Sequence, residues 1–301
     1  MAIKTIENDY MRVAVNEHGA EIISLFDKKK NRELIWCGDP KFWNRHSPVL
    51  FPFVGKVNGG VYHFDGKEYS MGQHGFARDK DFKCLDLPTD MTKIVFLLSS
   101  DDETRKAYPF EFELYISYEL FDSEIVVSWE VANTDVKDMF FSIGAHPAFN
   151  CPIAEGTDKE DYYVFLADEN GKGITSLQYV LIDKESEAVD VKHKHTLMTE
   201  KGYLRISEKL FENDALIFDD NQIKNASLCL PDKSSYVTID CSSFPSFGLW
   251  SKPNSNAPFI CLEPWIGRCD NKGFDGDLSE KYGETKVLSG DSFSASYLIK
   301  I

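Results

Sequence analysis

The sequence has few basic residues, and that shortage argues against several classes of function. Its 301 residues include 33 Lys and Arg against 49 Asp and Glu, which gives a formal net charge of −16. A nucleic-acid-binding protein needs a cationic face to release phosphate counterions, and an anionic lipid surface attracts cationic segments. We therefore expect neither a nucleic-acid partner nor a membrane partner. An anionic substrate would need its own cations within the site.

Long apolar runs and cysteine pairs are also missing. No apolar run of about 18 residues occurs, and the first residues lack the basic and apolar regions of a secretory signal, so neither a membrane span nor export is expected. The seven cysteines are irregularly spaced and include no CxxC pair. This spacing argues against a disulfide framework or a zinc site, and we expect a cytoplasmic protein that holds no metal.

Several motifs that mark common enzyme classes are absent. The sequence has no P-loop, no GxGxxG after a strand, no HExxH and no GxSxG. Their absence argues against nucleotide, zinc-peptidase and serine-hydrolase chemistry. His193 and His195 would share one face of a strand, but lysines flank them in a charged stretch. We interpret this stretch as a solvated loop and not as a metal site.

Apolar and polar residues alternate along most of the chain, with the period of a β-strand. The clearest case covers residues 110–131 and predicts a long antiparallel hairpin that turns at residues 122–123. A second hairpin is predicted around Asp65 and Gly66, a pair that suits a tight I′ turn. Further strands are predicted over residues 11–15, 20–26, 93–99, 139–143, 162–167, 203–207, 226–230, 235–241, 258–262 and 292–300.

Helical patterns are scarce. Residues 101–107 predict a short helix with acidic residues in its first turn. Strands separated by turns, with few short helices, predict an all-β fold, a large antiparallel sandwich or barrel. No repeat or linker divides the chain, so we expect a single domain over residues 1–301. Residues 155–161 and 183–200 are predicted to be surface insertions.

Two short segments depart from the β pattern in the first half of the chain, and such departures concentrate at functional sites. Residues 73–78 place His74 and Arg78 on either side of a glycine. Residues 142–149 end a strand before His146, and the proline that follows forces this residue into an extended conformation. The second segment therefore presents an imidazole at the end of a strand.

A third such segment lies near the C-terminus, where an apolar strand ends at Glu263, close to Trp265. Apolar surroundings raise the pKa of a carboxyl group, which suits a general base near neutral pH. Together the three segments predict a polar site with aromatic walls, a composition that suits sugars. Taken singly, each residue also fits a structural role, because a lone His or a Glu at a strand end usually has one.

Five short motifs occur in a fixed order along the chain. They are Gly19–Leu25 (GAEIISL), Phe51–Lys56 (FPFVGK), His74–Arg78 (HGFAR), Gly144–Phe149 (GAHPAF) and Leu262–Trp265 (LEPW). In this order they resemble the aldose 1-epimerase, or galactose mutarotase, family, and most closely its LacX-type branch. The resemblance extends over about residues 3–300. It implies one antiparallel β-supersandwich domain with a sugar cleft, and an isomerase that interconverts α and β anomers without a cofactor.

The resemblance also implies roles for three residues. Glu263 matches the base that takes the proton from the C1 hydroxyl of the sugar. His146 matches the acid that gives a proton to the ring oxygen, and we expect the two side chains to face each other across the sugar. His74 matches a second histidine that hydrogen-bonds the sugar near its ring oxygen.

Two further matches are less direct. Asp214 is matched to an aspartate that holds ring hydroxyls, with Asp219 and Asp220 as alternatives. Galactose mutarotases have an Asn-Arg pair where this chain has Val54-Gly55-Lys56. The substrate-binding guanidinium is thus replaced by the ammonium of Lys56, a point charge that cannot make a bidentate contact with hydroxyls, so galactose preference is in doubt.

Several alternatives stay open. Arg78 and Arg45 together would provide a cationic patch of the kind that hexose-6-phosphate mutarotases have near the phosphate, although the net charge argues mildly against it. A carbohydrate-binding protein without turnover would need no acid–base pair. A module that binds other proteins would show an exposed apolar patch. The expected partner is a small-molecule sugar, and the expected assembly is a monomer or a homodimer.

Overall fold

A computed structural model describes residues 2–85 and 92–301, and most of them lie in strands or in the loops between strands. The strand pairings that build the sheets are antiparallel. Within the described residues the only α-helix is α1 (Asp102–Ala107). The antiparallel all-β class with few short helices, predicted from the sequence, is therefore confirmed.

Three sheets form the body of the protein. The first has the order β1 (Ile3–Glu7), β2 (Met11–Asn16), β3 (Glu21–Asp27), β4 (Arg32–Glu33). The second has the order β18 (Tyr203–Arg205), β15 (Tyr163–Ala167), β20 (Asn225–Cys229), β21 (Ser235–Asp240), β25 (Ser292–Lys300), β11 (Glu124–Asn133), β10 (Phe112–Phe121), β9 (Lys93–Ser99), β8 (Lys83–Leu85). The third has the order β19 (Leu216–Phe218), β22 (Ser246–Trp250), β23 (Phe259–Ile266), β13 (Ile143–Ala145), β5 (Val49–Leu50), with β14 (Ala148–Asn150) also paired to β23.

Smaller elements complete the described residues. Three two-stranded ribbons pair β6 (Val61–Phe64) with β7 (Lys67–Ser70), β12 (Met139–Phe141) with β24 (Thr285–Val287), and β16 (Ser176–Tyr179) with β17 (His195–Met198). Short 3-10 turns are η1 (Asn58–Gly60), η2 (Ala77–Asp79), η3 (Lys159–Asp161), η4 (Glu208–Phe211) and η5 (Leu278–Glu280). None of the helices in the described residues is long and apolar enough to cross a membrane.

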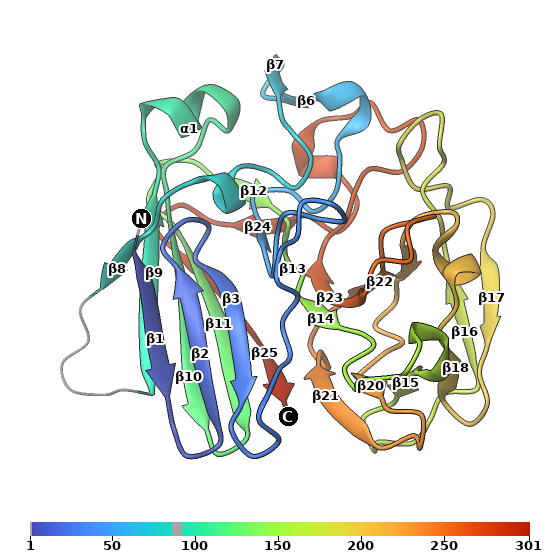
Figure 1. Ribbon diagram of the computed structural model, residues 1–301. Coiled ribbons are helices and arrows are strands. Elements are labelled where there is room, and N and C mark those ends of the chain that lie inside the picture. The colour runs from blue at the N-terminus through green and yellow to red at the C-terminus, as the bar shows by residue number, and fades with distance from the viewer. Residues whose placement is uncertain (1, 86–91) are drawn as a thin grey trace.

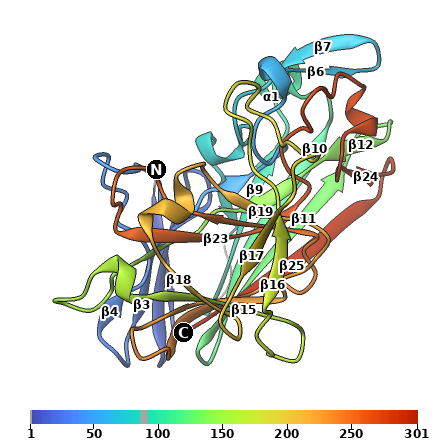
Figure 2. The same ribbon diagram turned by 90° about the vertical axis from the view of Figure 1, so that its right-hand side faces the viewer.

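The main core lies between the first sheet and the long strands of the second. Alternate residues of β10 are buried, and β2 and β3 cover them; the Tyr118 hydroxyl, for example, donates to the Ala20 carbonyl at 2.6 Å. Figure 1 shows β1–β3 in the same half of the molecule as β10 and β11, and β22 and β23 in the other half. The side view in Figure 2 shows β23 crossing the middle of the molecule, where it carries the candidate site.

Most predicted elements appear where the alternating pattern placed them. β9 and β25 have the predicted bounds, and β10 and β11 form the predicted long hairpin. The predicted tight turn joins β6 to β7, with φ of 50° at Asp65 and 70° at Gly66. α1 begins after Asp101, whose carboxylate accepts a hydrogen bond from the Thr104 amide at 2.6 Å and so caps the helix.

Three predictions about the elements were wrong. The strand predicted over 139–143 is interrupted at Ser142 and divided between β12 and β13, which belong to different sheets. The strand predicted to end at residue 262 continues to Ile266, so Glu263 lies inside β23 and not at its end. Residues 183–200 are not a simple surface insertion, because Val189 is fully buried and β17 lies within the segment.

Candidate active site

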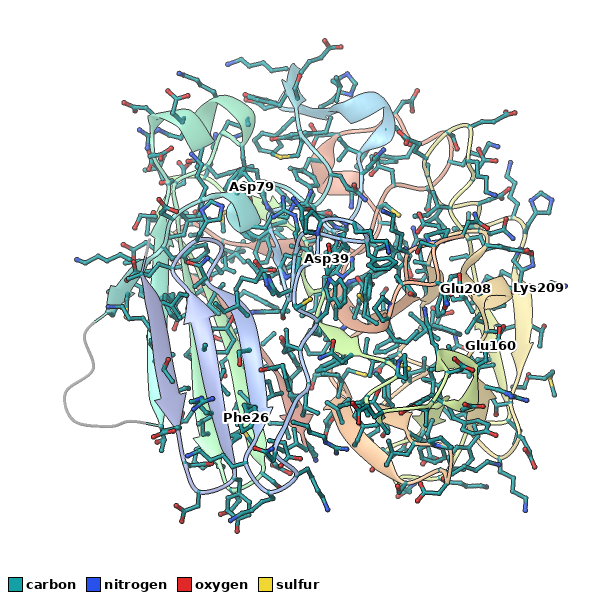
Figure 3. All side chains as sticks on the ribbon, viewed as in Figure 1. Phe26, Asp39, Asp79, Glu160, Glu208 and Lys209 are labelled. Atoms are coloured by element: carbon teal, nitrogen blue, oxygen red, sulfur yellow. The ribbon has the colours of Figure 1, made fainter. Side chains whose placement is uncertain are left out.

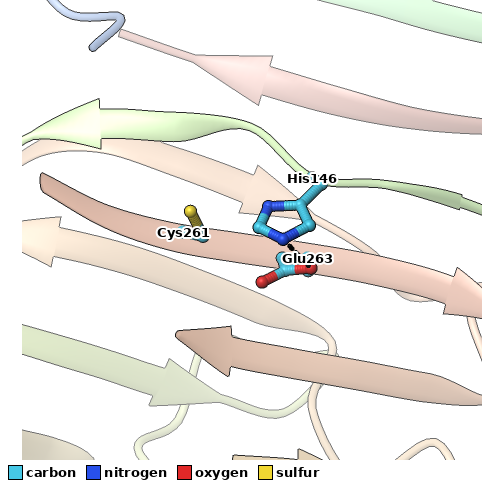
Figure 4. A group of neighbouring side chains, drawn as sticks. All are labelled: His146, Cys261 and Glu263. Atoms are coloured by element: carbon cyan, nitrogen blue, oxygen red, sulfur yellow. Dashed lines mark ion pairs between the residues drawn. The ribbon is translucent and has the colours of Figure 1, made fainter. Parts of the chain in front are cut away.

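Glu263 and His146 meet because two short strands pair with the same side of β23. β13 places Gly144 opposite Trp265, and β14 continues the same register farther along β23. His146 lies on the link between β13 and β14, so this register places it opposite Glu263. The two side chains are in contact, with 3.4 Å between Nε2 of His146 and Oε2 of Glu263 (Figure 4).

A cavity of about 670 Å³ opens over this pair. Six of the seven site residues predicted from the sequence line it: Lys56, His74, Arg78, His146, Asp214 and Glu263. Arg45, the seventh, is not among its lining residues. The structure thus brings together side chains from distant parts of the chain, and it places Arg45 outside the cavity.

Glu263 is 1% exposed, and its Oε2 has no hydrogen-bond partner in the described part of the chain. Burial raises the pKa of Glu263 well above its ordinary value, and the nearby carboxylate of Asp214 raises it further. The sequence predicted a raised pKa but assigned it to Trp265 and the apolar strand. The direction is as expected, but its sources are burial and Asp214, whereas the indole of Trp265 lowers the pKa of Glu263.

His146 is enclosed by aromatic rings. Its ring stacks on Trp43 at a centroid distance of 4.8 Å and meets Trp250 edge-on at 5.3 Å. Burial lowers the pKa of His146 to about 3, and the nearby guanidinium of Arg78 acts in the same direction. The stacked face of Trp43 would attract an imidazolium, which partly offsets the cost of charging a buried ring.

His74 is fixed as a hydrogen-bond donor toward the cavity. It has a φ of 66°, and its amide donates to the Gly55 carbonyl at 2.7 Å. The Gly55 amide in turn donates to Nδ1 of His74 at 3.0 Å, so the proton of the neutral ring is on Nε2. Burial lowers the pKa of His74 well below its ordinary value, with further contributions from His146 and Arg78. The next residue, Gly75, packs so closely on the Phe51 carbonyl that no Cβ fits there.

Of the three aspartates considered from the sequence, the fold places Asp214 at the cavity. It lies in a turn with a φ of 73°, and its Oδ1 accepts a hydrogen bond from the indole of Trp250 at 2.6 Å. Neither alternative lines the cavity: Asp219 pairs with Arg268 at 2.9 Å, and Asp220 occupies a turn with a φ of 65°.

The three cations that the sequence singled out, Arg78, Arg45 and Lys56, each have a partner. Arg78 donates to the Gln73 carbonyl at 2.7 Å and lies 3.7 Å from Asp79, a residue of η2. Arg45 makes a closer ion pair with Asp79, at 2.7 Å; Asp79 is labelled in Figure 3. Burial and the neighbouring Arg45 lower the pKa of Arg78 to about 10, so it stays charged at neutral pH. Lys56 pairs with Glu187, a residue of the segment predicted to be a surface insertion.

Trp265 lies flat against its neighbouring strands because two glycines face it. A Cβ at Gly144 would lie 2.5 Å from Cδ1 of Trp265, and a Cβ at Gly248 would lie 2.5 Å from Cη2 of the same ring. Carbon atoms in contact lie about 3.5–4.0 Å apart, so neither position admits a side chain without displacing the indole. The two glycines let the ring form part of the cavity wall next to Glu263.

Sequence reasoning missed the two aromatic walls, Trp43 and Trp250. Trp43 lies on the loop between β4 and β5, just after Asp39, which is labelled in Figure 3. Two large aromatic residues, Phe42 and Trp43, in a polar loop without strand periodicity are the pattern that could have indicated a binding surface. Trp250 is the last residue of β22. This strand was not predicted from the sequence, so nothing placed Trp250 near the other site residues.

His193 and His195 do not form a site. Nδ1 of His193 contacts Asp190 at 2.7 Å, and His195 stacks on Tyr179 at a centroid distance of 5.1 Å. Both histidines are exposed, and His195 belongs to β17 and not to a loop. In the described residues neither belongs to a group of potential metal ligands.

The sequence profile of the aldose 1-epimerase family matches residues 2–271. The chain belongs to the aldose 1-epimerase family. The chromosomal LacX protein of Lactococcus lactis subsp. lactis is 30% identical to it, and the match covers 98% of each chain. The resemblance to this family and to its LacX-type branch, predicted from five motifs, is confirmed.

Solved structures of related proteins have the same fold. The galactose mutarotase related enzyme from Lactobacillus acidophilus is 34% identical, with 99% of this chain and 97% of that chain covered and a TM-score of 0.90. A galactose mutarotase-like protein from Lactobacillus casei is 32% identical, with 99% of both chains covered and a TM-score of 0.88. The predicted galactose-mutarotase-like β-supersandwich is therefore confirmed. Family and neighbours together identify a sugar epimerase of the mutarotase kind.

Proposed function

We propose that this aldose 1-epimerase family member interconverts the α and β anomers of a free hexose or a related sugar, without a cofactor. Glu263 takes the proton from the C1 hydroxyl, and His146 gives a proton to the ring oxygen. The observation that carries the proposal is the contact between these two side chains, at 3.4 Å, in a cavity that is large enough for a sugar.

The distance between the two groups fits the atoms on which they would act. From the sequence we expected the two side chains on opposite sides of a sugar ring. The 3.4 Å between Nε2 of His146 and Oε2 of Glu263 leaves no room for a ring between them. The C1 hydroxyl and the ring oxygen are both bonded to C1. An acid and a base that act on these two oxygens must therefore be close neighbours, as His146 and Glu263 are.

The reaction keeps the charge of the pair constant. Proton transfer from the C1 hydroxyl to Glu263 forms the C1 carbonyl, and the ring C–O bond breaks as His146 protonates the leaving oxygen. Rotation about the C1–C2 bond and the reverse transfers then close the ring as the other anomer. The pair holds one proton throughout, either on the imidazolium or on the carboxyl group, so the cavity never contains an uncompensated charge. The lowered pKa of His146 and the raised pKa of Glu263 place this proton on the carboxyl group in the free protein, so it must pass to His146 before the ring opens.

The surrounding residues match the needs of a sugar. Trp43 and Trp250 offer aromatic faces for C–H groups. Nε2 of His74 and the carboxylate of Asp214 offer a donor and an acceptor for hydroxyls. Because Lys56 is engaged by Glu187, we expect it to shape the mouth of the cavity and not to hold the sugar by a bidentate contact.

Polarimetry tests the proposal. Freshly dissolved α-D-glucose, α-D-galactose and a hexose 6-phosphate are each followed to their rotational equilibrium with and without the protein. The proposal predicts that at least one free sugar equilibrates faster in proportion to protein concentration. If no sugar equilibrates faster while binding is still observed, the chain is a carbohydrate-binding protein without turnover.

A hexose 6-phosphate is the second candidate substrate. It is favoured by Arg78, whose Nε is buried at the cavity without a hydrogen-bond partner. Arg78→Ala should then weaken a hexose 6-phosphate much more than the free sugar, because a charge-assisted contact to phosphate is lost. Equal losses for the two sugars would mean that Arg78 holds the ring or the fold.

We also propose that residues 1–301 form one domain, cytoplasmic, present as a monomer or a homodimer. The second sheet supports the single domain, because it joins strands from β8 to β25 across most of the chain. The irregular spacing of the cysteines supports a reducing compartment. Equilibrium unfolding in a single transition, followed by Trp fluorescence and circular dichroism, would test the domain assignment.

A further inference from the structure

A third side chain, which the proposed reaction does not use, lies beside His146 and Glu263. Cys261 lies two residues before Glu263 on β23, so both side chains leave the strand on the same face. The Cys261 sulfur, a ring nitrogen of His146 and a carboxylate oxygen of Glu263 all lie within 4.8 Å of one another, and all three residues are buried (Figure 4). Within the described residues this is the only group of its kind.

We propose that His146, Cys261 and Glu263 form an inhibitory binding site for Zn²⁺ or a similar transition-metal ion. The ion would occupy the atoms that the proposed reaction uses for proton transfer, and a bound sugar would exclude it. The site itself does not depend on the proposed function, because the three side chains bind the ion whether or not a sugar is turned over.

The spacing of the three side chains is close to that of a zinc site. With zinc bonds of about 2.0–2.3 Å in a tetrahedron, neighbouring ligand atoms lie about 3.5 Å apart. Nε2 of His146 and Oε2 of Glu263 already have this separation, at 3.4 Å. Because the Cys261 sulfur lies within 4.8 Å of the other two atoms, it has to approach by no more than about 1 Å to complete three corners of a tetrahedron. The fourth corner would face the cavity, as in zinc sites that keep an open position.

One of the proposed ligand atoms, Oε2 of Glu263, is buried and has no hydrogen-bond partner within the described chain, and this observation is independent of the spacing. A buried polar atom without a partner is costly, so the group favours a ligand that binds to it. A carboxylate and a thiolate would together balance the charge of a divalent ion, which leaves no unpaired charge in the interior.

The donor set selects the class of metal. Thiolate and imidazole ligands favour Zn²⁺ and related transition metals. Mg²⁺ and Ca²⁺ need six or more oxygen ligands, and this group offers one carboxylate. The sequence predicted no metal site because the ligands do not form a recognisable spacing: they come from one strand and from a loop more than a hundred residues earlier in the chain.

Metal titration of the whole protein tests the proposal. Metal-free protein is titrated with ZnCl₂ by calorimetry and with CoCl₂ by absorption spectroscopy, which detects cobalt–thiolate bonds directly. We expect one ion per chain, a cobalt–thiolate band, weaker apparent Zn²⁺ binding in the presence of the sugar that is turned over, and no binding of Mg²⁺.

Matched cysteine variants identify the ligand. Loss of an outer-shell partner typically weakens metal binding by about 10–100-fold, so removal of a direct ligand in Cys261→Ser should weaken Zn²⁺ binding at least as much. Cys269→Ser is the control, because Cys269 is a buried cysteine that lines the cavity but lies outside the group, and the variant should bind Zn²⁺ as the wild type does. If Cys261→Ser does not fold, loss of the wild-type cobalt band in Glu263→Gln serves instead.

Three results would overturn the proposal: no bound ion, no cobalt–thiolate band, or equal Zn²⁺ affinity in Cys261→Ser and the wild type. Each result is distinct from a failure of the proposed function. If no sugar is epimerised, the titrations still report on the site. If Zn²⁺ does not bind, polarimetry still reports on the reaction.

Discussion

One added methyl group beneath Trp265 should disturb the site without touching an acid or a base. Gly248 on β22 lies opposite Glu263, and a Cβ there would lie 2.5 Å from Cη2 of Trp265. Carbon atoms in contact lie about 3.5–4.0 Å apart, so Gly248→Ala must move the ring by about 1 Å. Another part of the ring lies equally close to Gly144, so the indole has room to move only toward the cavity.

The size of the effect follows from this displacement. An extra methyl group in a packed interior costs about 1–3 kcal/mol of unfolding free energy. A shift of about 1 Å at a reacting site can lower the rate by about 100-fold. We therefore expect Gly248→Ala to unfold at lower urea concentration and to lose about 10–100-fold in kcat/KM for anomerisation. Urea unfolding and polarimetry measure the two effects on the same preparation.

Gly72→Ala is the matched control. Gly72 is exposed, does not have a positive φ, and would place its Cβ with no atom within 4 Å. The unfolding free energy of the Gly72→Ala variant should stay within about 0.5 kcal/mol of the wild-type value, and the activity of this variant should not change. If Gly248→Ala were as stable and as active as Gly72→Ala, the packing of Trp265 on glycine would not constrain the site, and the reasoning would be refuted.

Three further predictions concern the buried network, the aromatic wall and metal dependence. The Lys281 ammonium is buried and donates a hydrogen bond to the Glu284 carboxylate at 2.6 Å. Lys281→Met leaves this buried carboxyl group unpaired, so it should lower the free energy of unfolding, measured in urea, by about 3–5 kcal/mol. A decrease of less than about 1 kcal/mol would contradict this prediction. Trp43→Ala removes the ring stacked on His146 and should weaken sugar binding about fivefold in calorimetry, from about 1 kcal/mol of lost stacking. Unchanged affinity would contradict the assignment of Trp43 to the wall of the sugar cavity. Proton transfer by side chains needs no Lewis acid, so EDTA should not lower the rate of anomerisation, and a loss restored by one divalent ion would contradict the mechanism.

Strand prediction from the sequence succeeded where one face of a strand is buried and the other is half-exposed. β10 alternates in this way along its length, and its prediction was accurate. β23 is buried on both faces, so it has no alternation, and Pro264 was taken as its end. Proline has no backbone N–H, so it cannot donate a hydrogen bond to a neighbouring strand. Pro264 fits inside β23 because the chain that pairs with β23 on one side is interrupted between β13 and β14, where no such hydrogen bond is needed.

The candidate site was predictable in its residue types but not in its geometry. His146 and Glu263 stood out because each precedes a proline next to a strand, yet the register that brings them to 3.4 Å depends on two short strands pairing with β23. Trp43 and Glu187 lie on irregular loops, whose paths follow from tertiary packing and not from periodicity. For the same reason the sequence left three candidates for the aspartate, and the fold places only Asp214 at the cavity.

The role of Glu263 as the base is the central claim, and one substitution tests it most directly. Glu263→Gln keeps the shape of the side chain but cannot accept a proton, and Glu68→Gln, on the exposed β7, is the matched control. Anomerisation of the better sugar is followed by polarimetry, and binding by Trp fluorescence. The account predicts near-normal binding by Glu263→Gln with a rate lower by about two to four orders of magnitude, and no change in Glu68→Gln. A Glu263→Gln rate within about threefold of the wild type would contradict the assignment of Glu263 as the base.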